Sequence, residues 1–133
     1  MTLTGCFGLF DSGSDRITGK YYVLWIDLQE SQGISEADES NSGSYIGLVP
    51  EYVYSVGHND EFIIAKQHPT AGFNNGYKID TSRTNYFIID MNHKVLKTER
   101  KVIGPLSKMK FDSLRIELKI EKIKFDMNYP EIY

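Results

Sequence analysis

Strand-like segments follow one another through most of this chain, and one helical segment comes only near its end. The segments rich in β-branched and aromatic residues are 20–27, 51–56, 61–67 and 84–90, with turn-forming residues between several of them. Consecutive strands joined by short turns favour antiparallel pairing, and the lack of strand–helix alternation argues against a doubly wound nucleotide-binding fold. The sequence therefore predicts an α+β fold, a mostly antiparallel β-sheet with one C-terminal amphipathic helix packed on one face.

Segment 20–27 is apolar on both faces of the strand that it predicts. Its alternating residues are Tyr22, Leu24 and Ile26 on one face and Tyr21, Val23 and Trp25 on the other. A strand of this kind is either central in its sheet or covered on both sides.

The helix is predicted over residues 107–119, after Gly104 and Pro105 interrupt the β pattern. Ser107 is a favourable N-cap residue. The apolar residues that recur at helical spacing are Phe111, Leu114 and Leu118, and charged residues occupy the other face. This pattern predicts a helix that lies with its apolar side on the sheet.

Residues 30–44 are polar, acidic and rich in serine, with almost no apolar side chain to bury. This composition predicts a long mobile loop within the domain. The carboxylates of Glu36, Asp38 and Glu39 lack the spacing of a calcium-binding loop. We therefore expect a solvated acidic loop and no bound metal.

Cys6 is the only cysteine of the chain and follows Leu3, Thr4 and Gly5. Leu-Thr-Gly-Cys resembles the lipobox, the site at which bacterial lipoproteins are cut and then lipidated on the cysteine. A short stretch containing glycine and serine follows, which is typical of a tether. The resemblance implies a small bacterial lipoprotein, with a lipobox remnant and flexible tether over residues 1–17 and a single β-rich globular domain over residues 18–133.

A lipid on Cys6 would attach the protein to a membrane in the bacterial cell envelope, on the periplasmic side or as an outer-membrane lipoprotein. No apolar run of the sequence is long enough to span a bilayer, so attachment would depend on the lipid. If Met1 is the native start, the protein is cytoplasmic and Cys6 is an ordinary thiol. A single cysteine excludes an intrachain disulfide in either case.

A second resemblance covers the C-terminal half of the chain and the region of Cys6. Segments 62–67 and 85–90, followed by Gly104-Pro105-Leu106 and then by Phe111 and Leu114, resemble in that order a family of small bacterial lipoproteins of unknown function. The resemblance implies a location and a fold, and it offers no activity.

Catalytic and metal-binding motifs are missing from the sequence. His58, His68 and His93 each stand in or beside a predicted turn and have no partner at metal-ligand spacing, so they are expected to be surface residues. The alternative is a metal site assembled across turns, since Asp60 and Asp90 also lie at turns. The sequence contains neither a nucleophile elbow nor a glycine-rich phosphate loop. The net charge of −3 argues against nucleic acid as a partner. We expect no cofactor and no catalytic residue.

Tyrosine and phenylalanine are more numerous than one small core requires, and a rigid apolar ring with a polar tip suits a protein interface. The alternative for any one tyrosine is strand packing with the hydroxyl in solvent. The residues predicted to bind a partner are Glu36, Asp38, Glu39, Tyr52, Tyr54, Phe73 and Tyr77.

These observations predict a non-catalytic, envelope-anchored lipoprotein that binds another protein. The specific hypothesis is an immunity protein, in which an acidic surface neutralises an antibacterial toxin with a basic cleft. An accessory or structural lipoprotein of an envelope secretion or uptake complex is the alternative, and a small hydrolase ranks third. The expected partner is therefore a toxin or an envelope complex.

Overall fold

The computed structural model describes residues 13–25, 32–41, 43–70, 79–93, 95–96 and 100–129. These residues form two antiparallel sheets and one helix, which confirms the predicted α+β class. The first sheet, sheet A, contains β1 (Gly13–Thr18), β2 (Tyr21–Trp25), β3 (Gly33–Ala37) and β4 (Tyr45–Val49) in chain order. The second, sheet B, has the order β8-β7-β6-β5-β9 and contains β5 (Val53–His58), β6 (Phe62–Gln67), β7 (Asn85–Asp90), β8 (Val102–Leu106) and β9 (Met127–Asn128).

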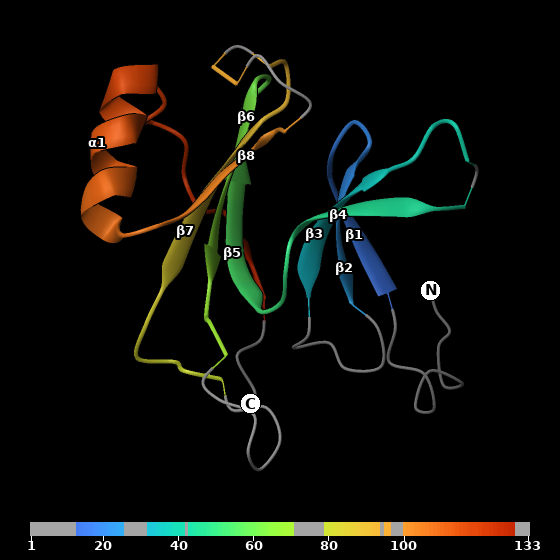
Figure 1. Cartoon of the computed structure of the whole chain (residues 1–133), viewed down its shortest axis with the longest axis horizontal. Coiled ribbons are helices and arrows are strands. Elements are labelled where there is room, and N and C mark those ends of the chain that lie inside the picture. The colour runs from blue at the N-terminus through green and yellow to red at the C-terminus, as the bar shows by residue number, and fades with distance from the viewer. Residues whose placement is uncertain are drawn as a thin grey trace.

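The two sheets pack face to face, and the helix α1 (Lys108–Leu118) covers the outer face of sheet B (Figure 1). The core between the sheets joins Val23 and Ile34 of sheet A to Val56 and Ile89 of sheet B in one cluster of buried side chains. Sheet B is therefore the middle layer of three, with apolar contacts on both of its faces.

Strands β6 and β7 show why the middle layer needs continuous apolar sequence. Ile63 and Ile89 belong to the core between the sheets, whereas Ile64 and Ile88 pack under the helix, and all four are fully buried. Alternate residues of a strand point to opposite faces, so a strand covered on both sides has no polar face. Strand β2 is a central strand of sheet A, as its apolar faces predicted.

The helix lies where the sequence predicts it. The Ser107 side chain accepts a hydrogen bond from the Lys110 backbone N–H, and Lys119, the C-cap residue after the helix, has a left-handed φ of 61°. Phe111 is buried and stacks on Tyr86 of β7 with 4.6 Å between ring centroids. The predicted apolar side of the helix therefore faces sheet B.

The prediction of a mobile loop over residues 30–44 is wrong, because β3 lies within it and pairs with both β2 and β4. Ile34 is fully buried and Glu36 is 7% exposed. A short strand with one covered face needs only a few apolar side chains on that face. In β3 one of the two inward side chains is the Glu36 carboxylate, which pairs with Lys20 and Lys101 from other segments. Local composition does not reveal such partners.

The prediction of a flexible tether over residues 1–17 is wrong for residues 13–17, because β1 begins at Gly13 and pairs with β2. Ile17 joins the core, and the Tyr129 hydroxyl donates a 2.7 Å hydrogen bond to Asp15. Burial, together with this bond, raises the pKa of the Tyr129 hydroxyl. Cys6 lies outside the described residues.

The segment around Gly104 and Pro105 is also strand rather than a break in the β pattern. It forms β8 at the edge of sheet B and pairs with β7. A proline is tolerated there because an edge strand has one side without a partner strand.

Candidate functional site

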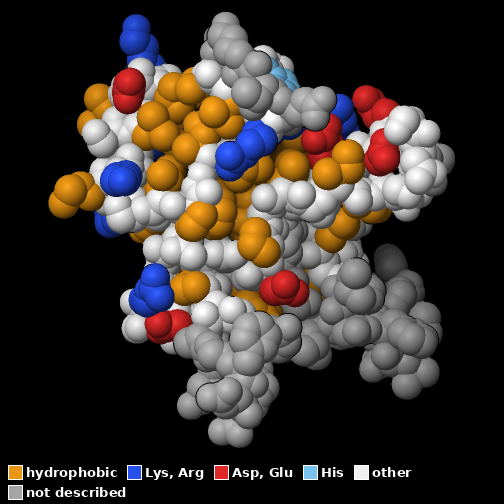
Figure 2. Space-filling view, viewed as in Figure 1, with side chains coloured by type: hydrophobic (Ala, Val, Ile, Leu, Met, Phe, Trp, Pro, Cys, Tyr) orange, Lys and Arg blue, Asp and Glu red, His pale blue; other side chains and the backbone are white. Residues whose placement is uncertain are grey.

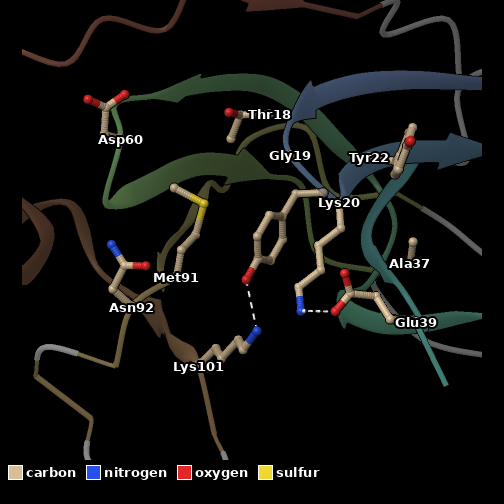
Figure 3. Close-up of a pocket in the computed structure, with 11 residues that line it drawn as sticks. Thr18, Gly19, Lys20, Tyr22, Ala37, Glu39, Asp60, Met91, Asn92 and Lys101 are labelled. Carbon is tan, nitrogen blue, oxygen red and sulfur yellow. Dashed lines mark hydrogen bonds and ion pairs between the residues drawn. The ribbon is translucent and has the colours of Figure 1, made fainter.

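A pocket of about 740 Å³ lies at one end of the sandwich, where turns of the two sheets meet. We call it the end pocket. Its lining includes Thr18, Gly19, Lys20, Tyr21 and Tyr22 around the β1–β2 turn, Ala37 and Glu39 at and after the end of β3, Asp60 of the β5–β6 turn, and Met91, Asn92 and Lys101 between β7 and β8 (Figure 3). Four separate segments of the chain therefore build it.

Local hydrogen bonds hold the turns that surround the end pocket. The Asn59 side-chain oxygen accepts hydrogen bonds from the backbone N–H groups of Glu61 and Phe62, both at 2.8 Å. The fully buried Asp90 carboxylate accepts hydrogen bonds from the N–H groups of Val95 and Leu96, also at 2.8 Å. The asparagine and aspartate side chains thus replace backbone partners in these turns.

An ion-pair cluster joins the two sheets beside the pocket. One oxygen of Glu36, on β3, lies 2.8 Å from the Lys101 ammonium and 2.9 Å from that of Lys20. Lys101, just before β8, also donates a 2.8 Å hydrogen bond to the Tyr21 hydroxyl of β2. Figure 3 shows the Lys101 side chain among the residues that line the pocket. This cluster is a polar link between the ends of sheets A and B.

Opposite charges in the cluster stabilise one another in their ionised forms. Burial raises the pKa of the Glu36 carboxyl, but hydrogen bonds from Lys101 and Lys20 outweigh that effect, so its pKa is lowered overall. Burial lowers the pKa of Lys101, and its bonds to Glu36 and Tyr21 reverse the sign. The hydrogen bond to Glu36 is also the main reason that the pKa of Lys20 is raised. The cluster is therefore charged at neutral pH.

The rim of the end pocket carries carboxylates on two sides. Glu39 lies 3.4 Å from Lys20, and its side chain is 78% exposed. Asp60 is exposed on the β5–β6 turn, across the pocket from Glu39 in Figure 3. Tyr22 and Met91 supply half-buried apolar surface between them. This arrangement suits a cationic side chain with an apolar stem, such as arginine or lysine.

The acidic residues predicted to bind a partner take three different positions. Glu36 is buried in the ion-pair cluster and is not presented at the surface. Asp38 accepts hydrogen bonds from the backbone and the side chain of Ser40, which lower the pKa of its carboxyl and shape the β3–β4 turn. Glu39 alone of the three lines the end pocket.

The predicted tyrosines lie away from the end pocket. Tyr54 is near the start of β5, whereas Asp60 follows the end of that strand. The Tyr54 ring stacks on His68 at 4.1 Å, and its hydroxyl lies 2.7 Å from the Thr84 hydroxyl. Tyr52 is half-buried in the linker before β5. The structure therefore does not bring the predicted acidic and aromatic residues together, and Phe73 and Tyr77 lie outside the described residues.

The prediction that the histidines are surface residues is wrong for His68, which is 4% exposed. Its Nδ1 lies 2.7 Å from the Arg83 backbone carbonyl. Across the described parts of the chain, no group of three or more histidine, cysteine, aspartate or glutamate residues is placed to hold a metal ion. The described segments also include no helix long and apolar enough to cross a membrane.

Sequence reasoning missed Lys20, Tyr21, Asp60, Met91 and Lys101, which come from segments far apart in the chain. One signal was available, because a strand that directs Ile34 inward also directs Glu36 inward. A buried carboxylate requires a basic partner. The identity of that partner depends on how the sheets stack, which local sequence does not determine.

The fold and its end pocket define a two-sheet α+β protein whose polar site is built from turns. A family model described as "Protein of unknown function (DUF3997)" matches residues 18–133, and the chain belongs to this family. No curated protein and no solved structure matches the chain. The expected membership of a family of unknown function is thereby confirmed.

Proposed function

We propose that this protein is a non-catalytic, envelope-anchored lipoprotein that binds another protein through the end pocket. The observation that carries the proposal is the pocket rim, where Glu39 and Asp60 flank the apolar surface of Tyr22 and Met91. Protein interfaces concentrate binding energy where an apolar centre is surrounded by a polar rim. A basic side chain of a partner fits this arrangement.

The specific role that we propose is that of an immunity protein, which neutralises an antibacterial toxin with a basic active-site cleft. The carboxylates at the rim oppose such a cleft, and the net charge of −3 favours its approach. A gene for a toxin next to the gene for this protein would support this role. Adjacent genes for secretion or uptake machinery instead favour the accessory lipoprotein.

The role requires a toxin gene next to this one, and binding of that toxin to the purified chain is measured by isothermal titration calorimetry. We expect Glu39→Lys combined with Asp60→Lys to weaken binding at least about tenfold, because both rim charges then repel a basic partner. The matched control reverses two exposed carboxylates outside the pocket, with Glu117→Lys and Asp126→Lys. Equal loss in both double variants would reduce the effect to net charge and contradict a role for the pocket.

The anchor is a separate part of the proposal and rests on Leu3-Thr4-Gly5-Cys6. The seven Cα–Cα steps from Cys6 to Gly13 span at most about 25 Å when extended, so a lipid on Cys6 would keep the domain close to the membrane. Metabolic labelling with palmitate tests this in the full-length gene product. Label that is lost in Cys6→Ser supports the anchor, and an unlabelled wild-type protein refutes it.

A further inference from the structure

A second pocket, which we call the lysine pocket, lies where the end of α1 meets the end of β5. Its volume is about 380 Å³, and its lining includes Lys119, Lys122 and Lys124 after the helix and His58 of β5. The described linings of the lysine pocket and the end pocket have no residue in common. Figure 2 shows basic side chains over the region of α1, including one at its upper end, where the helix ends in Figure 1.

The three lysines lack the carboxylate partners that other lysines of this chain have. Lys20, Lys101 and Lys108 each form an ion pair. The lysines of the pocket are exposed, and within the described segments none of them pairs with a carboxylate. Ammonium groups gathered in this way repel one another and are stabilised by an anion between them. The pocket therefore concentrates positive charge in a chain whose net charge is −3.

The loop that carries the lysines is held in place from below. The side chains of Ile120 and Ile123 are buried in the core under α1. The Arg115 guanidinium donates hydrogen bonds of 2.8 Å and 2.6 Å to the backbone carbonyls of Glu121 and Ile123. Two carbonyl oxygens that would repel an anion are thus bonded to a cation inside the loop.

A close contact with β5 fixes the far end of the same loop. The Lys124 carbonyl lies so near Gly57 that a Cβ at Gly57 would overlap it. This carbonyl therefore also faces the protein, while the Lys124 side chain is exposed. A charged loop that is already held in one shape loses little conformational freedom when it binds a ligand. The lysine pocket is in this sense preorganised for an anion.

The chemistry of the lining favours a phosphoryl group. Each ammonium group offers three donors to the several oxygens of a phosphate, and lysine binds phosphate as a point charge. The volume leaves room for a small organic group attached to the phosphate. Asp126, the one acidic residue of the described lining, would repel a second anionic group and so disfavours polyanions. We propose that the lysine pocket binds the phosphoryl group of a phosphate monoester.

Two probes separate the possible sources of this phosphoryl group, a soluble ester and a lipid head group. Isothermal titration calorimetry of the purified Cys6→Ser chain with glycerol 3-phosphate should give a dissociation constant below about 1 mM for a soluble ester. For a lipid head group, vesicles containing phosphatidic acid, a monoester, should bind the chain more tightly than phosphatidylglycerol vesicles of equal charge. Binding of either monoester supports the proposal and identifies the source, and binding of neither refutes it.

A pair of double variants tests whether the bound phosphate lies in the lysine pocket. Lys122→Gln with Lys124→Gln removes two of the three ammonium groups and should weaken binding at least about tenfold. The matched control, Lys108→Gln with Lys110→Gln, removes the same charge from exposed positions at the start of α1 and should leave binding unchanged. Melting temperatures verify that both variants are folded.

Undiminished binding in the Lys122 and Lys124 variant, or an equal loss in the control, would overturn the proposal, because net charge alone would then explain any effect. The phosphate site does not depend on the proposed function. The probes are titrated without a protein partner, so their failure would leave the end pocket and its partner untouched.

Discussion

Replacing Glu36 with glutamine tests the ion-pair cluster that joins the sheets. Glutamine keeps the size of the side chain and an oxygen for the lysines, so the change removes mainly the charge. The Glu36 side chain is 9% exposed and receives bonds from Lys101, which is 15% exposed, and from Lys20, which is 35% exposed. Removing one partner of a fully buried ion pair costs about 3–5 kcal/mol.

The residual exposure of both lysines reduces this cost, because water stabilises the ammonium groups that lose their partner. We expect the free energy of unfolding to fall by about 2–3 kcal/mol. For a chain of this length that corresponds to a decrease in melting temperature of about 7–10 °C. Glu39→Gln is the matched control, since Glu39 also pairs with Lys20 but is 78% exposed. Its expected cost is below about 0.5 kcal/mol.

Urea denaturation at several pH values gives the sign of the effect. The pKa of Glu36 is lowered on folding, so its charged interactions stabilise the protein above the unfolded value of about 4.5. The advantage of the wild type over Glu36→Gln should be constant at neutral pH and should disappear as the pH falls through the lowered pKa. A melting temperature within about 2 °C of the wild type at pH 7, or a difference that grows in acid, would refute the reasoning.

Two further substitutions test the packing of the middle layer. Phe111→Ala removes a side chain that is 1% exposed between α1 and sheet B, and it should lower the free energy of unfolding in denaturant by about 3–5 kcal/mol. A decrease below about 1.5 kcal/mol would contradict the place of Phe111 in the core. Gly57→Ala should lower the free energy of unfolding by about 1–3 kcal/mol, because the new Cβ would overlap the backbone carbonyl of Lys124. Gly47→Ala places its Cβ in open space and should change the free energy of unfolding by less than about 0.5 kcal/mol. Equal effects of the two substitutions would contradict the tight contact at Gly57.

Local sequence patterns predicted the elements whose burial is dominated by apolar residues. Strands β6 and β7 are apolar on both faces, and α1 has a recognisable N-cap in Ser107 and apolar residues at helical spacing. Strand β3 was missed because only Ile34 and Glu36 of its residues are buried, and the second of these is stabilised by Lys101, 65 residues later in the chain. Strand β8 was missed because its proline is acceptable only at an edge.

The candidate site was harder to predict than the fold, for a physical reason. The end pocket is built from turns, and the residues of each turn are the ones that commonly form turns. The side chains of Asn59 and Asp90 accept hydrogen bonds from nearby backbone N–H groups, so the local sequence predicts a turn and nothing more. The pocket exists only because the stacked sheets bring these turns to the same end. Glu39 was predicted as a partner-binding residue, but Asp60, across the pocket, was not, because the turns that carry them belong to different sheets.

The ion-pair cluster also connects stability with the proposed binding role. Lys101 and Lys20 line the end pocket and bond to Glu36, which lies outside the pocket lining. Loss of the Glu36 charge therefore weakens the polar link between the sheets, in which the Lys101–Tyr21 hydrogen bond remains, without altering the carboxylates on the rim. If the pocket depends on the relative position of the sheets, Glu36→Gln weakens partner binding at temperatures where the protein is still folded. If each turn holds its own shape, binding is retained while the melting temperature falls. Measuring both quantities on one variant separates a rigid frame formed by the stacked sheets from turns that are shaped independently.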